Sequence, residues 1–238
     1  MFKKNLLAAV AVKNKSHIIS YCLLMLSTFC IFAIAEFIRS YLITYQLSSM
    51  FISFCVGFIL FTPLVSILLH PLLFNNLIIK QRSGLNIMLK NIGLVMVVQC
   101  LFFLIWITDA IAVYSIYVDQ NSFLAKAFNM NNVNSTNYSV SFYWGNLLLA
   151  WLFAWLSLAI GVMPCLIAQL NNKSVVQNFI ASLSFAKRYK CFFLLCAFLL
   201  ACAVVLPMLY AHYLFFVCFP LVLTLIFTRL ATRYRSII

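Results

Sequence analysis

Long apolar blocks separated by short polar segments make up most of this chain. A helix rises ~1.5 Å per residue, so about 20 apolar residues cross the ~30 Å hydrocarbon core of a bilayer. The apolar stretch 191–228 is almost twice that long as one helix and must fold back, with Pro207 to Tyr213 as the expected turn. The pattern therefore predicts an all-α, polytopic transmembrane bundle that forms one integral membrane domain over residues 1–238. Its six expected spans cover about 18–38, 50–74, 92–118, 142–170, 191–207 and 212–228.

Amphipathic basic segments precede the outward spans of this pattern. The clearest is 171–190, which we expect to be an interfacial helix on the cytoplasmic side. Its apolar stripe consists of Val175, Val176, Phe179, Ile180, Leu183 and Ala186, with Gln177, Asn178, Ser182, Ser184, Lys187 and Arg188 mostly opposite. Residues 1–17 fit a short interfacial helix or a disordered basic tail. Three units of a basic segment and a span hairpin suggest a three-fold repeat, although any even-span protein of this charge pattern looks periodic.

Composition excludes a soluble protein. Hydrophobic residues make up 66% of the chain and charged residues 8%, against about 25% charged in a soluble domain. So much apolar surface cannot be hidden inside a soluble domain of 238 residues, and the surrounding solvent must be lipid. Ala33-Ile34-Ala35 before Glu36 also resembles a signal-peptidase site, but the apolar block is as long as a true span.

Charge placement predicts the orientation. Of 16 lysines and arginines, fourteen fall in the two ends and in the segments 75–90 and 171–190, and only Arg39 and Lys126 fall on the other side. This positive-inside pattern predicts cytoplasmic N- and C-termini in a bacterial inner membrane, with anionic lipid headgroups as partners. Dispersed edge charges argue against binding of nucleic acid. The expected headgroup anchors are Lys3, Lys4, Lys13, Lys15, Lys80, Arg82, Lys187, Arg188, Lys190, Arg229 and Arg233.

Candidate chemistry is sparse. Glu36 and Asp109 lie near the far ends of their spans, with Arg39 one turn from Glu36. They form either an outer polar cluster for a cation or proton, or interfacial side chains that reach water with Glu36 paired to Arg39. The nine cysteines contain no CxxC pair, and no catalytic motif or metal-ligand spacing is present. We therefore expect no enzyme activity, no catalytic residue, no metal and no cofactor.

The order of these parts resembles the YciC-like group of small bacterial six-span membrane proteins, related in outline to the membrane domain fused to some glycerophosphodiester phosphodiesterases. A basic prelude before the first span carries the likeness, as does the loop Lys80-Gln81-Arg82-Ser83-Gly84-Leu85. Met163-Pro164-Cys165-Leu166 followed by the segment 171–190 is the third part. The first far-side loop is shorter than that group implies. The resemblance implies an architecture and no site residues.

Two classes of function fit these observations. The first is a structural or accessory membrane protein that organises lipid or a membrane complex, alone, as a homo-oligomer or with a membrane-protein partner. The second is a small transporter or channel with the outer acidic cluster. Transporters place polar groups or broken helices near the midplane. Pro63 and Pro164 are candidate breaks without an acidic partner at that depth, and the remaining mid-span positions are almost wholly apolar, which favours the first class.

Overall fold

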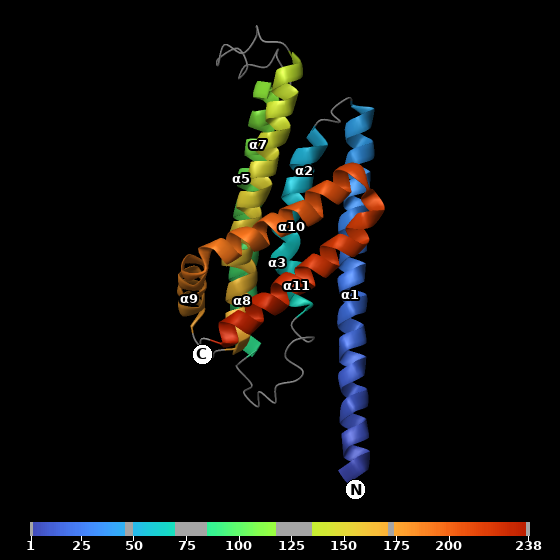
Figure 1. The fold of residues 1–238 in the computed structure, drawn as a ribbon, viewed down its shortest axis with the longest axis vertical. Helices are drawn as coiled ribbons and strands as arrows, with labels where there is room; N and C mark the ends of the chain where they lie inside the picture. Colours follow the sequence, from blue (N-terminus) through green and yellow to red (C-terminus); the bar gives the residue numbers. More distant parts are fainter. Residues whose placement is uncertain (1, 46–49, 70–84, 118–134, 171–173, 237–238) are drawn as a thin grey trace.

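The computed structural model describes the backbone of residues 2–45, 50–69, 85–117, 135–170 and 174–236. Within these ranges it describes the side chains of 18–45, 50–69, 89–112, 114–115, 142–170 and 174–236. The regular elements in this part of the chain are helices, which confirms the all-α prediction (Figure 1). They are α1 (Phe2–Thr44), α2 (Phe51–Phe58), η2 (Ile59–Phe61), α3 (Thr62–Ile67), α5 (Leu85–Tyr117), α7 (Ser135–Leu156), η3 (Ser157–Val162), α8 (Met163–Leu170), α9 (Val175–Arg188), α10 (Lys190–Tyr210), η4 (His212–Leu214) and α11 (Phe215–Arg235).

Five helical stretches in the described chain are long and apolar enough to cross a membrane. They are Ile18–Thr44, Leu89–Ala112, Phe142–Leu170, Lys190–Tyr210 and His212–Arg235, which correspond to five of the six expected spans. The chain is therefore an integral membrane protein. The expected second span at 50–74 corresponds to a shorter helical run, Phe51–Ile67, and its last residues lie outside the described part. A count of six spans and the three-fold repeat stay predictions.

The N-terminal segment differs from both sequence interpretations. We expected 1–17 to be a separate interfacial helix or a disordered tail, and the first span to end near residue 38. Instead one continuous helix, α1, begins at Phe2 and ends at Thr44. Its start and the end of α11 both lie in the lower half of Figure 1, where α1 projects well below the other helices. At ~1.5 Å per residue α1 is ~65 Å long, so it extends beyond the ~30 Å hydrocarbon core; only its apolar part, Ile18–Thr44, is a candidate span, where continuous helix satisfies the backbone groups in lipid.

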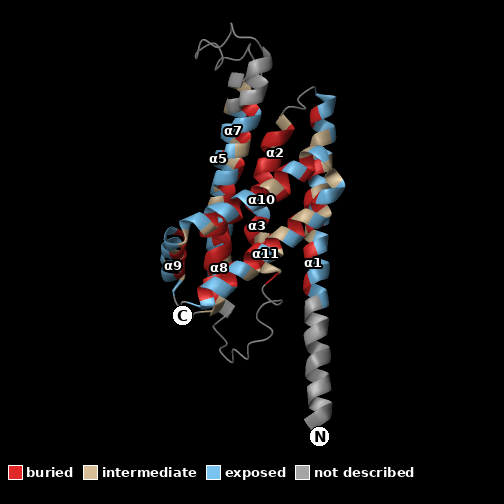
Figure 2. Ribbon diagram, in the orientation of Figure 1, coloured by how far each residue is buried: buried red, intermediate tan, exposed pale blue. Residues whose placement is uncertain are grey.

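The run α2–η2–α3 forms the centre of the bundle. Nearly every side chain from Phe51 to Ser66 is buried, and Figure 2 shows this run as an almost unbroken buried strip. It packs against α1, α5, α7, α10, η3 and α11. Two hydrogen bonds, which we call the polar clasp, connect α2 to its neighbours. The Ser53 hydroxyl donates to Asn146 Oδ1 at 2.7 Å, and the Trp106 indole donates to the Ser53 carbonyl at 2.9 Å. The clasp thus joins α2 to α7 and α5.

Two irregular helical segments meet beside this centre. Pro63 lies in the first turn of α3, where a missing N–H costs least. The predicted disturbance at Pro164 takes the form of a π-helix, η3, that ends just before it. The two segments approach closely at Gly161, because a Cβ built there would lie 2.2 Å from Pro63 Cγ. Only a residue without a side chain lets α3 and η3 pack at this distance.

Helix α9 is amphipathic as predicted, but two of the six residues expected on its polar side are buried. It begins with a capping box in which Ser174 and Gln177 satisfy each other's backbone N–H groups. Asn178 and Ser182, expected on the outer polar face, are buried against neighbouring helices. The Ser182 hydroxyl donates to the Ala159 carbonyl within η3, and Asn178 Nδ2 donates to Asn91 Oδ1 at 3.5 Å. The apolar residues that remain exposed are Val176, Ile180 and Leu183.

The last two spans form a hairpin that crosses the bundle diagonally (Figure 1). α10 packs on α7 and α2, and α11 packs on α10 and α1. The chain reverses at Ala211 and η4, within the turn expected between Pro207 and Tyr213. Fold-back is required by length, since 38 apolar residues in one helix would far exceed the hydrocarbon core.

Candidate functional site

A basic–aromatic cluster forms where the α9–α10 junction meets the end of α11. We define it as Lys187, Arg188, Tyr189, Lys190, Phe192, Arg229 and Arg233. The Arg233 Cζ atom lies 4.0 Å from the Phe192 ring centroid and 5.7 Å from that of Tyr189, and Arg188 Cζ lies 5.8 Å from Tyr189. Two basic segments that are 40 residues apart in the chain, around 190 and 230, are thereby brought together.

The local sequence explains why the junction has this shape. Tyr189 leaves helical geometry, with φ −111° and ψ 41°, so α9 ends at Arg188 and α10 begins at Lys190. Backbone bonds continue across the break, from Tyr189 N–H to the Phe185 carbonyl and from Phe193 N–H to the Tyr189 carbonyl, both at 3.0 Å. Lys187 and Arg188 occupy the last turn of α9, where cations interact favourably with the helix dipole.

Aromatic contacts fix the junction to α11. The Phe185 ring lies 5.5 Å from the Tyr234 ring, edge to face, and 5.8 Å from the Phe193 ring in the same manner. Such pairs each add about 0.5–1.5 kcal/mol beyond area burial. The C-terminal turn of α11 is therefore anchored, and Arg233 lies directly against α10.

Within the described residues the acidic side chains are Glu36 on α1 and Asp109 on α5, and neither forms an ion pair with a cationic residue of this cluster. The five cationic side chains of the cluster are all exposed. A ring that covers one face of a guanidinium leaves its in-plane N–H donors available, and those donors match the oxygens of a phosphate. The arrangement is thus an exposed cationic surface, partly ordered by aromatic rings, at one end of the hairpin.

The structure describes some of the predicted headgroup anchors and leaves others outside its described part. Lys187, Arg188, Lys190, Arg229 and Arg233 come together in the cluster. Lys3, Lys4, Lys13 and Lys15 belong to α1, but their side chains lie outside the described residues. Lys80 and Arg82 lie outside the described part of the chain altogether.

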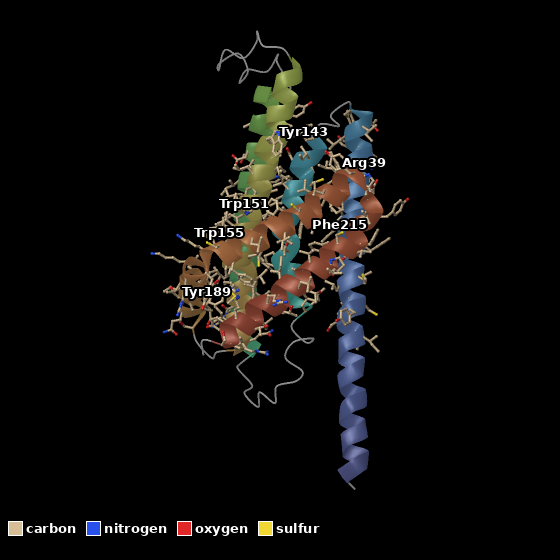
Figure 3. All side chains as sticks on the ribbon, viewed as in Figure 1. Arg39, Tyr143, Trp151, Trp155, Tyr189 and Phe215 are labelled. Atoms are coloured by element: carbon tan, nitrogen blue, oxygen red, sulfur yellow. The ribbon has the colours of Figure 1, made fainter. Side chains whose placement is uncertain are left out.

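The predicted outer polar cluster is only partly assembled. Glu36 and Arg39 form an ion pair with a 3.7 Å N–O distance, as the sequence suggested. His212 joins this pair. The Nδ1 atom of His212 lies 3.5 Å from Glu36 Oε1, and Arg39 Nη1 donates a hydrogen bond to the Nε2 atom of His212. Asp109 is exposed on α5, which lies across the bundle from α1 (Figure 1), so it does not join Glu36. Figure 3 shows Arg39 and Tyr189 at opposite ends of the α10–α11 hairpin.

The sequence interpretation missed a set of buried polar residues on several helices. We had taken the mid-span positions as almost wholly apolar. Thr62 and Ser157 have no exposed surface, Gln99 is 5% exposed, and their side-chain polar atoms make no hydrogen bond within the described residues. They surround the Pro63–Gly161 contact, and Gln99 Nε2 lies 2.9 Å from the position of a Cβ on Gly161. The sequence signal that could have revealed them is the presence of single polar residues within long apolar runs.

Among the described residues no group of three or more histidine, cysteine or acidic side chains is placed to hold a metal ion. No protein-family model, curated protein or solved structure matches this chain.

Proposed function

We propose that this integral membrane protein is an accessory protein that binds anionic lipid headgroups on the cytoplasmic side through the basic–aromatic cluster. The observation that carries the proposal is the Arg233 guanidinium packed 4.0 Å above Phe192. Held in this way, the guanidinium presents donors to a phosphate without first losing much side-chain entropy. In this role the protein binds and organises neighbouring lipids or a membrane complex at the end of the α10–α11 hairpin, and it carries out no catalytic step.

Magnitudes support binding of lipid rather than of a soluble anion. Each lysine or arginine near an anionic bilayer surface contributes about 1 kcal/mol, so the five cationic residues of the cluster supply roughly 5 kcal/mol. That energy falls with salt, because the Debye length is ~8 Å at physiological ionic strength. The proposal places both termini and the cluster in the cytoplasm of a bacterial cell, in the inner membrane, as the positive-inside rule predicts. Because the cluster lies at the ends of apolar spans, the phosphates nearest to it are those of lipid headgroups, and we propose lipid rather than nucleic acid as its partner.

Lipid selectivity tests this proposal directly. Protein purified in mild detergent is incubated with equal amounts of phosphatidylglycerol and phosphatidylcholine, and bound lipid is counted by native mass spectrometry. We expect wild type to retain phosphatidylglycerol preferentially, and Arg233→Gln and Phe192→Leu to lose most of that preference. Lys90→Gln is the matched control, because it removes one exposed cation outside the cluster. Equal retention by Arg233→Gln and Lys90→Gln would mean that general charge, rather than the built cluster, selects the lipid.

A small transporter is the second candidate, and one observation favours it. The π-helical segment η3 packs against α3, the helix that directly follows η2, and the hydroxyls of Thr62 in α3 and Ser157 in η3 make no hydrogen bond within the described residues. Broken helices with polar groups near the midplane are typical of transporter substrate sites. Uptake of solutes into proteoliposomes, lost in Thr62→Val and Ser157→Ala, would support this candidate over the accessory role.

A further inference from the structure

Helix α1 lies at the edge of the bundle and is only partly enclosed. The buried share of its most apolar stretch is 28%, against 56% for that of α10. It packs mainly against α2 and α11, and the α10–α11 turn lies beside it in Figure 1. An aromatic contact holds it to this hairpin, because the Phe32 ring lies 4.6 Å from the Phe216 ring. A polar contact, which we call the outer link, consists of Glu36, Arg39 and His212.

The geometry of the outer link requires a neutral imidazole. A guanidinium can only donate, so the Nε2 atom of His212 accepts the hydrogen bond from Arg39 Nη1 and carries no proton. These partners assign the single ring proton to Nδ1, which lies 3.5 Å from Glu36 Oε1. Neutral His212 therefore bridges both members of the Glu36–Arg39 ion pair. Through this bridge η4 is joined to α1.

A second proton on the ring would break this bridge. Protonated Nε2 is a donor, so it no longer accepts from Arg39. The imidazolium then repels the guanidinium that it contacts, because both carry positive charge. Glu36 attracts the imidazolium, but its Oε1 atom is the more distant partner and already pairs with Arg39 at 3.7 Å. Arg39 keeps that pair and the Phe51 ring, which lies 6.0 Å from its Cζ atom. The contact that weakens is therefore the one between α1 and the turn.

The other groups around His212 do not take up this charge. Within the described residues, the charged side chains that contact it are the two members of the ion pair. α10 and η4 add the phenols of Tyr210 and Tyr213, which are 81% and 85% exposed, and α11 adds the thiol of Cys218. Phenols and thiols are ordinarily neutral in weak acid. The His212 side chain is 22% exposed, so protons from water reach it.

We propose that His212 is an acid sensor that releases the outer part of α1 from the α10–α11 turn when it binds a proton. Histidine is the side chain that ordinarily changes charge between about pH 5 and 8, so weak acid is enough. The linked state binds fewer protons than the released state, so the link is present at neutral pH and is lost as the pH falls. In the positive-inside orientation this end faces away from the cytoplasm, and the sensor responds to the pH outside. The proposal does not depend on lipid binding by the basic–aromatic cluster.

Hydrogen–deuterium exchange in lipid nanodiscs, read by mass spectrometry at about pH 8 and about pH 5, tests the proposal. Each exchange rate is divided by the intrinsic rate of an open amide at the same pH. In wild type, acid should raise the corrected exchange several-fold in peptides that cover 36–45 and 208–215. The α9–α10 junction, 185–193, lies at the other end of the hairpin and should show no such change.

Three variants separate the sensor from a general effect of acid. His212→Gln keeps an acceptor for Arg39 but does not titrate, so it should remove the acid effect and leave the exchange at about pH 8 near that of wild type. Arg39→Gln removes the repelling charge, so acid should no longer loosen the two segments. His17→Gln is the matched control, because it removes a histidine outside the outer link, and it should keep the full acid effect.

Equal corrected exchange at both pH values in wild type overturns the proposal. So does an acid effect that survives in His212→Gln, because another group would then be responsible. An acid effect undiminished in Arg39→Gln overturns it as well, because charge repulsion would not be the cause. Exchange that rises equally over 185–193 would show general loosening in acid instead of release of α1. Loss of anionic-lipid selectivity in Arg233→Gln bears on the basic–aromatic cluster and not on the outer link.

Discussion

Substitution of Gly161 by alanine should destabilise the bundle, although alanine normally strengthens a helix. The added Cβ would lie 2.2 Å from Pro63 Cγ, 2.7 Å from Pro63 Cβ and 2.9 Å from Gln99 Nε2. The glutamine amide can move, but the proline ring is rigid and is held in the buried α3 helix. Accommodation therefore requires α3 and η3 to separate, which also disturbs the contacts of the buried centre.

The magnitude follows from two opposing terms. Overpacking of a well-packed core costs about 1–3 kcal/mol. Replacement of glycine by alanine inside a helix gains about 0.5–1 kcal/mol. The net expectation is a loss of about 1–2 kcal/mol in the free energy of unfolding. Gly145 is the matched control on the same helical run: no atom lies within 4 Å of a Cβ there, so Gly145→Ala should be neutral or stabilising.

Reversible unfolding in mixed detergent and SDS micelles, followed by tryptophan fluorescence, measures both variants against wild type. A double variant with Pro63→Ala removes the nearest ring atom, so it should be less destabilised than the sum of the two single variants by about 1 kcal/mol. If Gly161→Ala is as stable as Gly145→Ala, the close α3–η3 contact does not exist as described. Additive effects of Gly161→Ala and Pro63→Ala would lead to the same conclusion.

Two further variants test contacts that join distant segments. Ser182→Ala should lower the free energy of unfolding by about 1 kcal/mol, because it removes the donor to the Ala159 carbonyl in η3. Ser184→Ala, on the exposed side of α9, should have no effect in the same unfolding assay. Equal effects of the two substitutions would contradict a structural role for Ser182. His212→Phe should lower the stability of the protein by about 1 kcal/mol or less, as measured by thermal unfolding, because it removes the contacts to Glu36 and Arg39. His212→Gln should retain much of that stability, and Tyr213→Phe should match wild type. A His212→Phe protein as stable as wild type would show that this cluster does not hold α1 to the hairpin.

Particular residues show how far sequence reasoning reached. The reversal near Pro207 was predictable because a continuous apolar stretch longer than a bilayer must turn, wherever its neighbours lie. The pairing of Glu36 with Arg39 was predictable because three residues on a helix bring side chains to one face. The addition of His212 was not, since it lies 173 positions from Arg39 and reaches it only after the hairpin crosses α1.

The buried polar residues show the same limit from the other side. Asn178 and Ser182 look like an outer polar face in a helical projection, because a projection assumes that polar residues face water. In the folded chain the π-helical segment η3 provides a carbonyl for Ser182, and the apolar residues Val176 and Ile180 remain exposed instead. In lipid the usual rule that apolar residues face inward loses its force, because the surroundings are as apolar as the core.

By itself, the sequence determined that this protein is helical, that it lives in a membrane, and about where its long spans begin and end. Those properties depend on the length and polarity of continuous segments, and each residue contributes to them independently of its neighbours in the folded structure. Only the tertiary structure decided that α2–η2–α3 is buried along most of its length, that Arg233 lies on Phe192, and that the Gln99 amide is buried without a hydrogen-bond partner in the described residues. Each of these depends on which helices become neighbours, and packing between apolar helices leaves almost no trace in the sequence of either one.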